Sequence, residues 1–363
     1  MKKERILLGA LAAALIGASL PAYASGKTEG DSWTSLPNEV AVNDKGTLTV
    51  GYVMIGSESD WRIACNRSIQ ETFTRENGYS LLTSDAQQKA EKQIKAVREF
   101  INQEVDYILL DPLVENGWDA SLEEAREAGI PVIVFDREVA SKEEDDYVAW
   151  LGSDFYLEGQ RACAYLKEYL ERTGYEGELN IVHIQGTLDS SAQIGRTRAL
   201  DDALLENKSW TLLDRKEGEF TTAKGKEVMV DMLENYGDKI QVVYCENDNE
   251  AYGAISAIEE AGLKAGTSLK DGEILVLSFD STHGGLSMTK DGEILVNTEC
   301  APLYGPLLSQ LIGRIENGEE VSHIQYVREE QFSSLAEPGE VTVGEEVYPV
   351  TLTTDELLEA RSY

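Results

Sequence analysis

Basic residues are scarce in this 363-residue sequence: 32 Lys and Arg stand against 66 Asp and Glu, a formal net charge of −34. A chain this acidic repels the phosphate backbone of nucleic acids and anionic membrane surfaces, so we expect neither as a partner. The charge is compatible with a neutral or cationic small molecule as the ligand. The hydrophobic fraction of 42% is too high for a disordered chain, and the length favours two domains.

Histidine and cysteine are also few, with three and four residues. The cysteines (Cys65, Cys163, Cys245 and Cys300) form no C-x-x-C pair and no Cys/His cluster. We therefore expect no structural zinc site, and no other metal or cofactor. The spacing of the cysteines is compatible both with buried thiols and with one disulfide.

Long apolar runs are missing except near the start of the chain. Residues 6–20 are apolar, follow a charged segment at 1–5, and precede small residues ending at Ala24. This order is typical of a cleaved export signal. We expect a signal peptide over 1–24, a flexible lead-in over 25–46, and a soluble mature protein in the periplasm or at the cell surface.

Short apolar runs then alternate with longer amphipathic stretches. Strands are predicted at 48–55, 79–83, 107–110 and 132–135, with helices near 61–76, 88–103 and 116–128. The rhythm restarts with strands at 179–184, 211–213, 241–244, 273–279 and 293–297, and with helices near 191–206, 222–236 and 249–261. Such alternation predicts two α/β parallel sheets in tandem. From residue 337 on, the chain is polar and predicted to be poor in strands before a short helix at 355–361.

Polar side chains follow several of these strands, at the edge of a parallel sheet where ligands bind. About half of them could simply cap the next helix. Capping does not explain Arg137 directly after Asp136, or the pair Trp61 and Arg62 at the first crossover. Carboxylates beside guanidinium groups form paired hydrogen bonds to adjacent hydroxyls, and an aromatic ring covers the C–H face of a sugar. The pattern therefore predicts a sugar site.

At these residues the chain resembles the type I periplasmic sugar-binding proteins of ABC transporters, and the galactofuranose-binding members more than the ribose-binding ones. The resemblance covers about residues 47–330. Its motifs are 56–62 (GSESDWR), 87–98 (QQKAEKQIKAVR), 112–118 (PLVENGW), 135–137 (FDR), 185–187 (QGT), 218–229 (GEFTTAKGKEVM) and 247–248 (ND).

The resemblance implies an α/β fold of two Rossmann-like lobes, with parallel sheets joined by a multi-strand hinge. The N-terminal lobe would comprise 47–152 plus about 300–326, the C-terminal lobe 153–299 plus about 327–350, with a C-terminal tail at 351–363. The implied function is that of a monomer without catalytic residues, which captures a monosaccharide by hinge closure and delivers it to an ABC permease.

The resemblance also implies which residues contact the ligand. Trp61 would stack on one face of the sugar and Phe220 on the other. Asp111 stands where galactofuranose-type members are apolar, so the resemblance does not determine which sugar fits. The full implied set is Glu58, Trp61, Arg62, Asp111, Asp136, Arg137, Arg196, Phe220, Asn247, Asp280 and Glu299.

Three other functions are compatible with parts of this pattern: a repressor, an enzyme and a sensor. Lac-repressor-type regulators share the core, but they begin with a basic DNA-binding domain where this chain has its apolar segment. A glycoside-acting enzyme needs a protonated general acid, and Arg137 and Arg196 would keep nearby carboxylates ionised. A sensor that presents sugar to a membrane kinase would have the same pocket, so the sequence does not separate sensing from transport.

Overall fold

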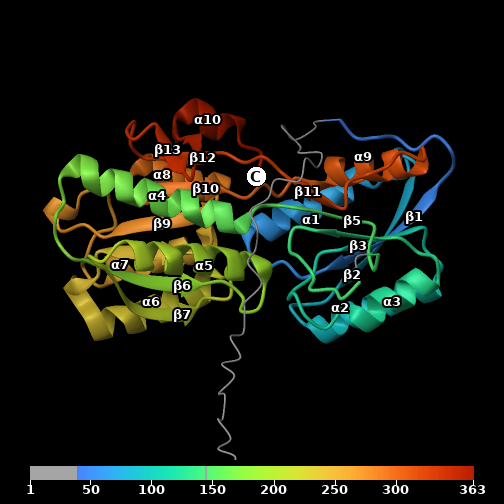
Figure 1. The fold of residues 1–363 in the computed structure, drawn as a ribbon, viewed down its shortest axis with the longest axis horizontal. Helices are drawn as coiled ribbons and strands as arrows, with labels where there is room; N and C mark the ends of the chain where they lie inside the picture. The colour runs from blue at the N-terminus through green and yellow to red at the C-terminus, as the bar shows by residue number, and fades with distance from the viewer. Residues whose placement is uncertain (1–38, 144) are drawn as a thin grey trace, which may run out of the picture.

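The structure, a computed structural model, describes residues 39–143 and 145–363. The expected export signal and most of the lead-in lie outside the described residues. Two lobes lie side by side, each with helices on both faces of a central sheet (Figure 1). Among the described residues, no helix combines the length and apolarity needed to cross a membrane.

The first lobe is built on six parallel strands in the order β11-β5-β4-β3-β1-β2. Its central strands are buried along their whole length, as expected of a parallel sheet covered on both faces. Its elements are β1 (Leu48–Met54), α1 (Asp60–Thr72), β2 (Tyr79–Asp85), α2 (Ala90–Asn102), β3 (Tyr107–Leu110), α3 (Asp119–Glu127), β4 (Val132–Phe135), β5 (Ala149–Gly152), α9 (Tyr304–Glu316) and β11 (Ile324–Tyr326).

The second lobe has seven strands in the order β15-β12-β10-β9-β8-β6-β7, with only the β10–β12 pair antiparallel. Its elements are α4 (Phe155–Thr173), β6 (Leu179–Gln185), α5 (Ser191–Glu206), β7 (Trp210–Glu217), α6 (Thr222–Tyr236), the 3₁₀ turn η1 (Gly237–Lys239), β8 (Val242–Cys245), α7 (Asp248–Glu260), η2 (Leu269–Asp271), β9 (Leu275–Asp280), α8 (His283–Asp291), β10 (Val296–Glu299), β12 (Gln331–Ser333), β15 (Thr351–Leu352) and α10 (Asp355–Ala360).

Both sheets share one topology. The first five strands of each lobe follow the order β2-β1-β3-β4-β5 and β7-β6-β8-β9-β10. The predicted pair of α/β sheets in tandem is thereby confirmed. In such sheets the strand order reverses beside the first strand, and the carboxyl ends of the strands there form a crevice for ligands.

Helix caps bring polar groups to these carboxyl ends. Ser59, Ser190, Thr221 and Asn247 each precede a helix, and their side chains accept a hydrogen bond from a backbone N–H three residues further on. Such caps satisfy the free N–H groups of the first helical turn. The same side chains therefore fix where α1, α5, α6 and α7 begin relative to the crevice.

The chain crosses three times between the lobes. It passes from β5 to α4 at residues 153–154, returns from β10 to α9 at 300–303, and passes again from β11 to β12 at 327–330. Helix α9, late in the sequence, thus packs in the first lobe, where it lies against α1 (Figure 1).

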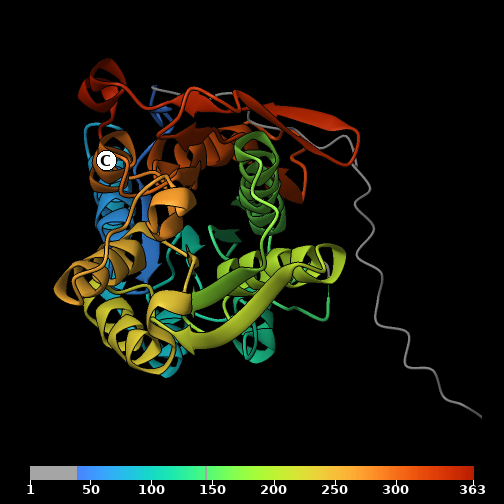
Figure 2. The ribbon, with the colours of Figure 1, turned by 90° about the vertical axis from the view of Figure 1, so that its left-hand side faces the viewer.

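The predicted lack of strands after residue 337 is wrong. Strands β13 (Glu340–Val343) and β14 (Glu346–Pro349) form a hairpin whose turn contains Gly344 at a φ of +61°. Val341 of this hairpin is buried against the core that includes α4, and Figure 2 shows the hairpin beside that helix. The packed face is narrow, so apolar periodicity in the sequence is weak there. β15 extends the second sheet and α10 packs on α8.

All four cysteines are buried free thiols. Of the two states compatible with their spacing, the structure therefore contains the thiols. Cys65 and Cys300 lie in the core of the first lobe, and Cys163 and Cys245 lie in two separate cores of the second.

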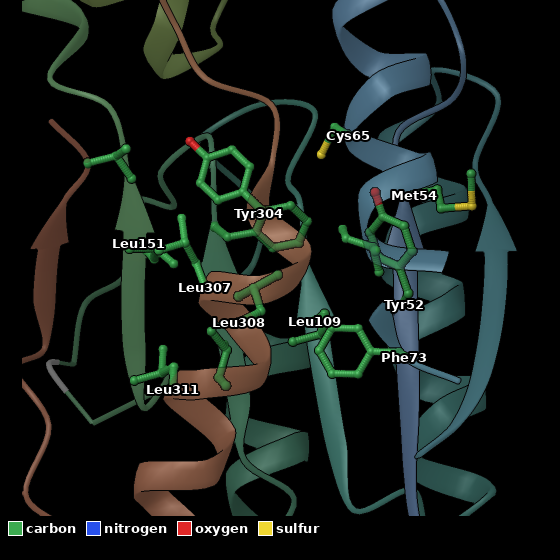
Figure 3. Close-up of a cluster of buried hydrophobic side chains, with 14 of the residues drawn as sticks. Tyr52, Met54, Cys65, Phe73, Leu109, Leu151, Tyr304, Leu307, Leu308 and Leu311 are labelled. Atoms are coloured by element: carbon green, nitrogen blue, oxygen red, sulfur yellow. The ribbon is translucent and has the colours of Figure 1, made fainter. Parts of the chain in front are cut away.

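The core of the first lobe depends on α9. Figure 3 shows Tyr304, Leu307, Leu308 and Leu311 of this helix facing the side chains of β1 and β3. All four are fully buried. Since a buried leucine contributes several kilocalories through transfer and close packing, the return of the chain to the first lobe has a strong driving force.

We predict that Leu308→Ala lowers the free energy of unfolding by about 2–5 kcal/mol, because it leaves a cavity in this core. Urea denaturation followed by circular dichroism would measure the change. Leu205→Ala is the matched control, since Leu205 is 67% exposed, and we expect it to change stability by less than about 0.5 kcal/mol. Equal effects of the two substitutions would contradict the assignment.

Candidate ligand-binding site

A narrow cavity of about 30 Å³ lies between the lobes, at the carboxyl ends of both sheets. The residues that line it are Glu58, Ser59, Trp61, Arg62, Asp136, Arg137, Phe155, Ala192, Arg196, Phe220, Asn247, Asp280 and Cys300.

The lobes are closed around this cavity. Asp60 at the start of α1 donates its backbone N–H to Oδ1 of Asn249 on α7, at 3.0 Å. The Arg137 guanidinium lies 5.1 Å from the centre of the Phe220 ring across the cleft. Trp61 and Phe220, which come from opposite lobes, are each only 4% exposed. A ligand in the cavity is thus shielded from solvent on both sides.

On the first lobe, Arg62 is surrounded by carboxylates. Its Nε lies 3.1 Å from Oε1 of Glu58, its Nη2 lies 2.9 Å from Oδ2 of Asp136, and its Nη1 donates to Asp111. These pairs hold the guanidinium 4.5 Å from the ring centre of Trp61. Because removing one member would leave buried charges uncompensated, the cluster fixes the side chains as a unit.

Two carboxylate oxygens of this cluster have no hydrogen-bond partner within the described residues, namely Oε2 of Glu58 and Oδ1 of Asp111. Loss of hydration raises the pKa of Asp111 well above its usual range, although Arg62 opposes this. Buried oxygens of this kind normally accept hydrogen bonds. The Glu58 oxygen borders the cavity, so a hydroxyl donor there would satisfy it.

Arg137 differs from Arg62 because no carboxylate lies within ion-pair distance of it in the described part of the chain. Its Nη1 donates to the backbone oxygen of Leu113 at 2.9 Å. Burial and the nearby charge of Arg62 lower the pKa of Arg137. Four of its five N–H groups are thus free to donate to acceptors in the cavity.

On the second lobe, Arg196 on α5 occupies the corresponding position. Its Nε lies 2.8 Å from Oε2 of Glu158, its Nη1 lies 2.5 Å from the backbone oxygen of Glu246, and its Nη2 lies 3.6 Å from Oδ1 of Asp280. Burial raises the pKa of Asp280 despite the opposing charge of Arg196. The second wall therefore also pairs a guanidinium with carboxylates.

Several cavity residues adopt backbone conformations that side chains other than glycine rarely take. Asp136, Phe220 and Asp280 have φ values of +59°, +57° and +96°. Such strain costs on the order of 1–3 kcal/mol for each residue and persists where the surrounding structure enforces it. A Cβ on Gly186 would lie 1.9 Å from the Phe220 ring, so the ring packs directly on this glycine.

Nine of the eleven side chains implied by the resemblance line the cavity, and two lie elsewhere. Asp111 is completely buried behind Arg62. Glu299 lies 2.5 Å from Nη1 of Arg361 and accepts a hydrogen bond from Tyr363 at 2.7 Å, so its carboxylate is engaged by the end of the chain.

Four lining residues were not anticipated from the sequence. Ser59 caps α1, Ala192 lies in the first turn of α5, Phe155 opens α4, and Cys300 follows β10. The carbonyl of Cys300 accepts a hydrogen bond from Nε1 of Trp61 at 2.6 Å. The end of β10 is another strand end at the same sheet edge, which is the signal that could have identified Cys300.

The acidic run 246–250 does not present free metal ligands. The Asp248 carboxylate accepts from Ser278, Asn297 and Thr282, and burial raises its pKa to about 6 despite these bonds. Glu246 accepts hydrogen bonds from the Gly186 N–H and the Thr197 hydroxyl. The oxygens are thus committed to protein donors that fix the strand ends.

Comparison with known proteins agrees with this architecture. The family profile described as "Periplasmic binding protein domain" matches residues 50–298. The chain belongs to the periplasmic binding protein family.

Three relatives of this periplasmic binding protein are informative. The galactofuranose-binding protein YtfQ of Escherichia coli (strain K12) is 37% identical, over 73% of this chain and 81% of its own. A Mycobacterium smegmatis protein in complex with β-D-fucofuranose has a TM-score of 0.74 and 36% identity, over 79% of this chain and 91% of its own. The periplasmic binding protein component of the arabinose ABC transporter from Shewanella sp. ANA-3, bound to L-arabinofuranose, has a TM-score of 0.72 and 34% identity. The match covers 79% of this chain and 92% of that protein.

These similarities confirm the expected type I fold of two lobes with parallel sheets. The relatives are sugar-binding proteins, and the third is part of an ABC transporter. They are binding proteins rather than enzymes. None of them tests which side chains of this chain contact a ligand, so the eleven residues stay a prediction in that respect.

One carboxyl group connects the three crossings between the lobes, which form the hinge of this periplasmic binding protein. Oε1 of Glu329, in the third crossing, accepts from the Ser153 hydroxyl at 2.7 Å in the first crossing and from the Ala301 N–H at 2.8 Å in the second. Glu158 and Cys300 lie close by. One carboxylate oxygen of each glutamate and Sγ of Cys300 all lie within 4.8 Å of one another.

The surroundings of the Glu158 and Glu329 carboxyls favour a proton shared between them. Oε1 of Glu158 has no hydrogen-bond partner among the described residues. Loss of hydration and the charge of Glu158 raise the pKa of Glu329 well above its usual range, and burial also raises the pKa of Glu158 despite Arg196. A proton between the two oxygens relieves both effects, because two buried carboxylates side by side do not both stay ionised.

We predict that the melting temperature falls as the pH rises from about 5 to about 8, since the folded protein holds a proton that an unfolded glutamate, with a pKa of about 4.3, has already released. Glu329→Gln should raise the melting temperature at about pH 8 and flatten this slope. Its amide oxygen can accept the two hinge hydrogen bonds, and its NH₂ can donate to Glu158.

Differential scanning calorimetry at the two pH values would measure this effect. Glu330→Gln is the control, because Glu330 is the exposed neighbour on the same segment, and it should leave the slope unchanged. A lower melting temperature of Glu329→Gln at both pH values would rule out the shared proton.

Proposed function

We propose that this chain is exported, loses residues 1–24, and as a soluble monomer captures a monosaccharide by hinge closure for delivery to an ABC importer. The closing units are 47–152 with about 300–326, and 153–299 with about 327–350. The hinge comprises the three crossings between them. No covalent step is involved, and no cofactor or metal takes part.

The observation that carries this proposal is the composition of the enclosed cavity. Aromatic rings enter from both lobes, and guanidinium and carboxylate groups alternate between them. Hydroxyls need donors and acceptors side by side, and the apolar faces of a sugar ring need aromatic surface. Arg62 and Arg196 are balanced by carboxylates of the protein itself, which favours a neutral ligand.

A sugar in its five-membered ring form fits this site best. The galactofuranose, fucofuranose and arabinofuranose named for the three relatives are all of this form. The proposed substrate is therefore a furanose of the galactose or arabinose type, or a closely related pentose or hexose.

A thermal-shift screen tests this function, because a ligand that binds only the folded state raises the melting temperature. The panel would contain D-galactose, L-arabinose, D-fructose and D-ribose, with D-galacturonate as a charged probe. At least one neutral sugar should raise the melting temperature, and the protein should convert none of the sugars to a product. Stabilisation by D-galacturonate alone would contradict a neutral ligand.

We predict that Arg137→Ala weakens binding of the sugar found in this screen by about 10²-fold, because ligand acceptors in a dry site would lose charge-assisted partners. Trp61→Ala should weaken it by roughly 1–3 kcal/mol through lost stacking and burial. Isothermal titration calorimetry measures both. Glu299→Ala serves as the contrast, because its side chain does not border the cavity, and its dissociation constant should change little.

Gly186→Ala tests the position of Phe220 without altering a polar group. The added methyl would overlap the Phe220 ring, so the ring must leave its place. Affinity should then fall by about fivefold, the equivalent of one aromatic contact of about 1 kcal/mol. Gly313→Ala on α9 is the control, since its Cβ would meet only Ala41 at 3.6 Å. Unchanged affinity of Gly186→Ala would exclude a stacking role for Phe220.

A further inference from the structure

Acidic residues of the two lobes lie in segments that meet at one side of the closed cleft, outside the ligand cavity. Glu115 follows β3 and Glu138 follows β4 in the first lobe. Facing them are Asp189, in the loop before α5 of the second lobe, and Asp154, the N-cap of α4. We call these four residues the acidic seam.

Direct hydrogen bonds hold the lobes together along the acidic seam. The Glu115 N–H donates to the backbone oxygen of Asp189 at 3.0 Å. The Glu138 N–H donates to Oγ of Ser191 at 2.8 Å. The two segments of the first lobe are also joined to each other, because the Ala140 N–H donates to the Glu115 carbonyl at 2.8 Å. Closure of the lobes therefore determines how near the carboxyls of the seam come to each other.

Within the described residues, no lysine or arginine forms an ion pair with Glu115, Glu138, Asp154 or Asp189. The nearest guanidinium in sequence, that of Arg137, is directed to the Leu113 carbonyl and the Phe220 ring instead. The Asp154 carboxylate accepts from the Leu157 N–H at 2.9 Å. Closure thus brings like charges together without a compensating cation. It covers Glu115, Glu138 and Asp154, which are half-buried, whereas Asp189 stays exposed.

These surroundings disfavour ionisation in the closed state. Loss of hydration, with smaller contributions from Glu115 and Asp154, raises the pKa of Glu138 to about 7. Loss of hydration and the charge of Asp189 raise the pKa of Glu115 as well. Burial likewise raises the pKa of Asp154. In an open cleft, water would hydrate the same glutamates and return their pKa towards the ordinary value of about 4.3.

We propose that closure of the cleft takes up protons at the acidic seam, chiefly on Glu138, so that the protein binds its sugar more tightly at acidic pH. This inference rests on the proposed capture of a sugar by closure. The acidic seam lies apart from the ligand contacts, so it would regulate affinity without changing which sugar is recognised.

The direction follows from linkage. At a pH between the open and closed pKa values of Glu138, the open state has lost a proton that the closed state holds, so closure binds a proton from solution. Raising the pH through this window disfavours closure and weakens sugar binding. Below the window Glu138 is protonated in both states, and above it the full loss of affinity has been reached.

Isothermal titration calorimetry of the full mature chain tests this directly. The probe is whichever of D-galactose, L-arabinose, D-fructose and D-ribose gives the largest thermal shift. Between about pH 5 and about pH 8 the dissociation constant should increase at least about tenfold, since one pKa unit corresponds to a tenfold change. At about pH 6, the binding enthalpy should depend on the ionisation enthalpy of the buffer, with a slope that reports proton uptake.

Glu138→Gln should abolish most of this pH dependence and bind at about pH 8 nearly as tightly as the unaltered protein does at about pH 5. Glu293→Gln is the matched control. The Glu293 carboxyl also has a raised pKa caused by burial, but its neighbours Glu259 and Asp291 belong to its own lobe. Lobe closure does not change these surroundings, so the control should retain the full pH dependence.

The outcomes separate the inference from the function it rests on. If none of the four sugars binds at either pH, the proposed function fails. If a sugar binds with the same affinity at both pH values, or without proton uptake, the function stands and the acidic seam has no regulatory role. Equal pH dependence in the unaltered protein and Glu138→Gln would also overturn the inference, because another group would then carry the proton.

Discussion

The three crossings of the chain between the lobes are the constraint on which the rest of the structure depends. A single carboxyl, that of Glu329, accepts hydrogen bonds from the other two crossings through Ser153 and Ala301. The crossings therefore act as one hinge. Glu158, beside Glu329, also holds Arg196, which lines the cavity. The hinge and the ligand site are thus connected through two side chains, and the position of one affects the other.

Charge balance explains how so acidic a chain can contain a site suited to a neutral ligand. Arg62 is paired with three carboxylates and Arg196 with two. Among the residues that line the cavity, three arginines stand against three carboxylates, although the whole chain has a formal net charge of −34. Most of the excess acid lies outside the cavity. At the acidic seam it has no compensating cation, and there closure of the cleft changes the cost of ionisation.

The candidate site was predictable where residues follow strands in sequence. Asp136, Arg137, Asn247 and Asp280 lie within about three residues of the end of a predicted strand, so alternation and parallel-sheet geometry placed them at the ligand-binding edge. Glu299 also ends a strand, but its carboxylate is engaged by Arg361, which follows α10 and lies 62 residues later in the chain. No local pattern reveals such a partner. The burial of Asp111 behind Arg62 was equally unpredictable from local sequence, because it depends on how α1 packs.

The sequence by itself determined the class of fold, two α/β sheets in tandem, because buried parallel strands and the helices between them produce local apolar periodicity. It also determined the chemistry available at the strand ends. Only the tertiary structure decided that the β13–β14 hairpin packs on α4, and that the segments of Glu115 and Glu138 meet the loop of Asp189 and Ser191 across the cleft. These contacts join segments far apart in the chain, and their energies come from burial and desolvation, which no local pattern encodes.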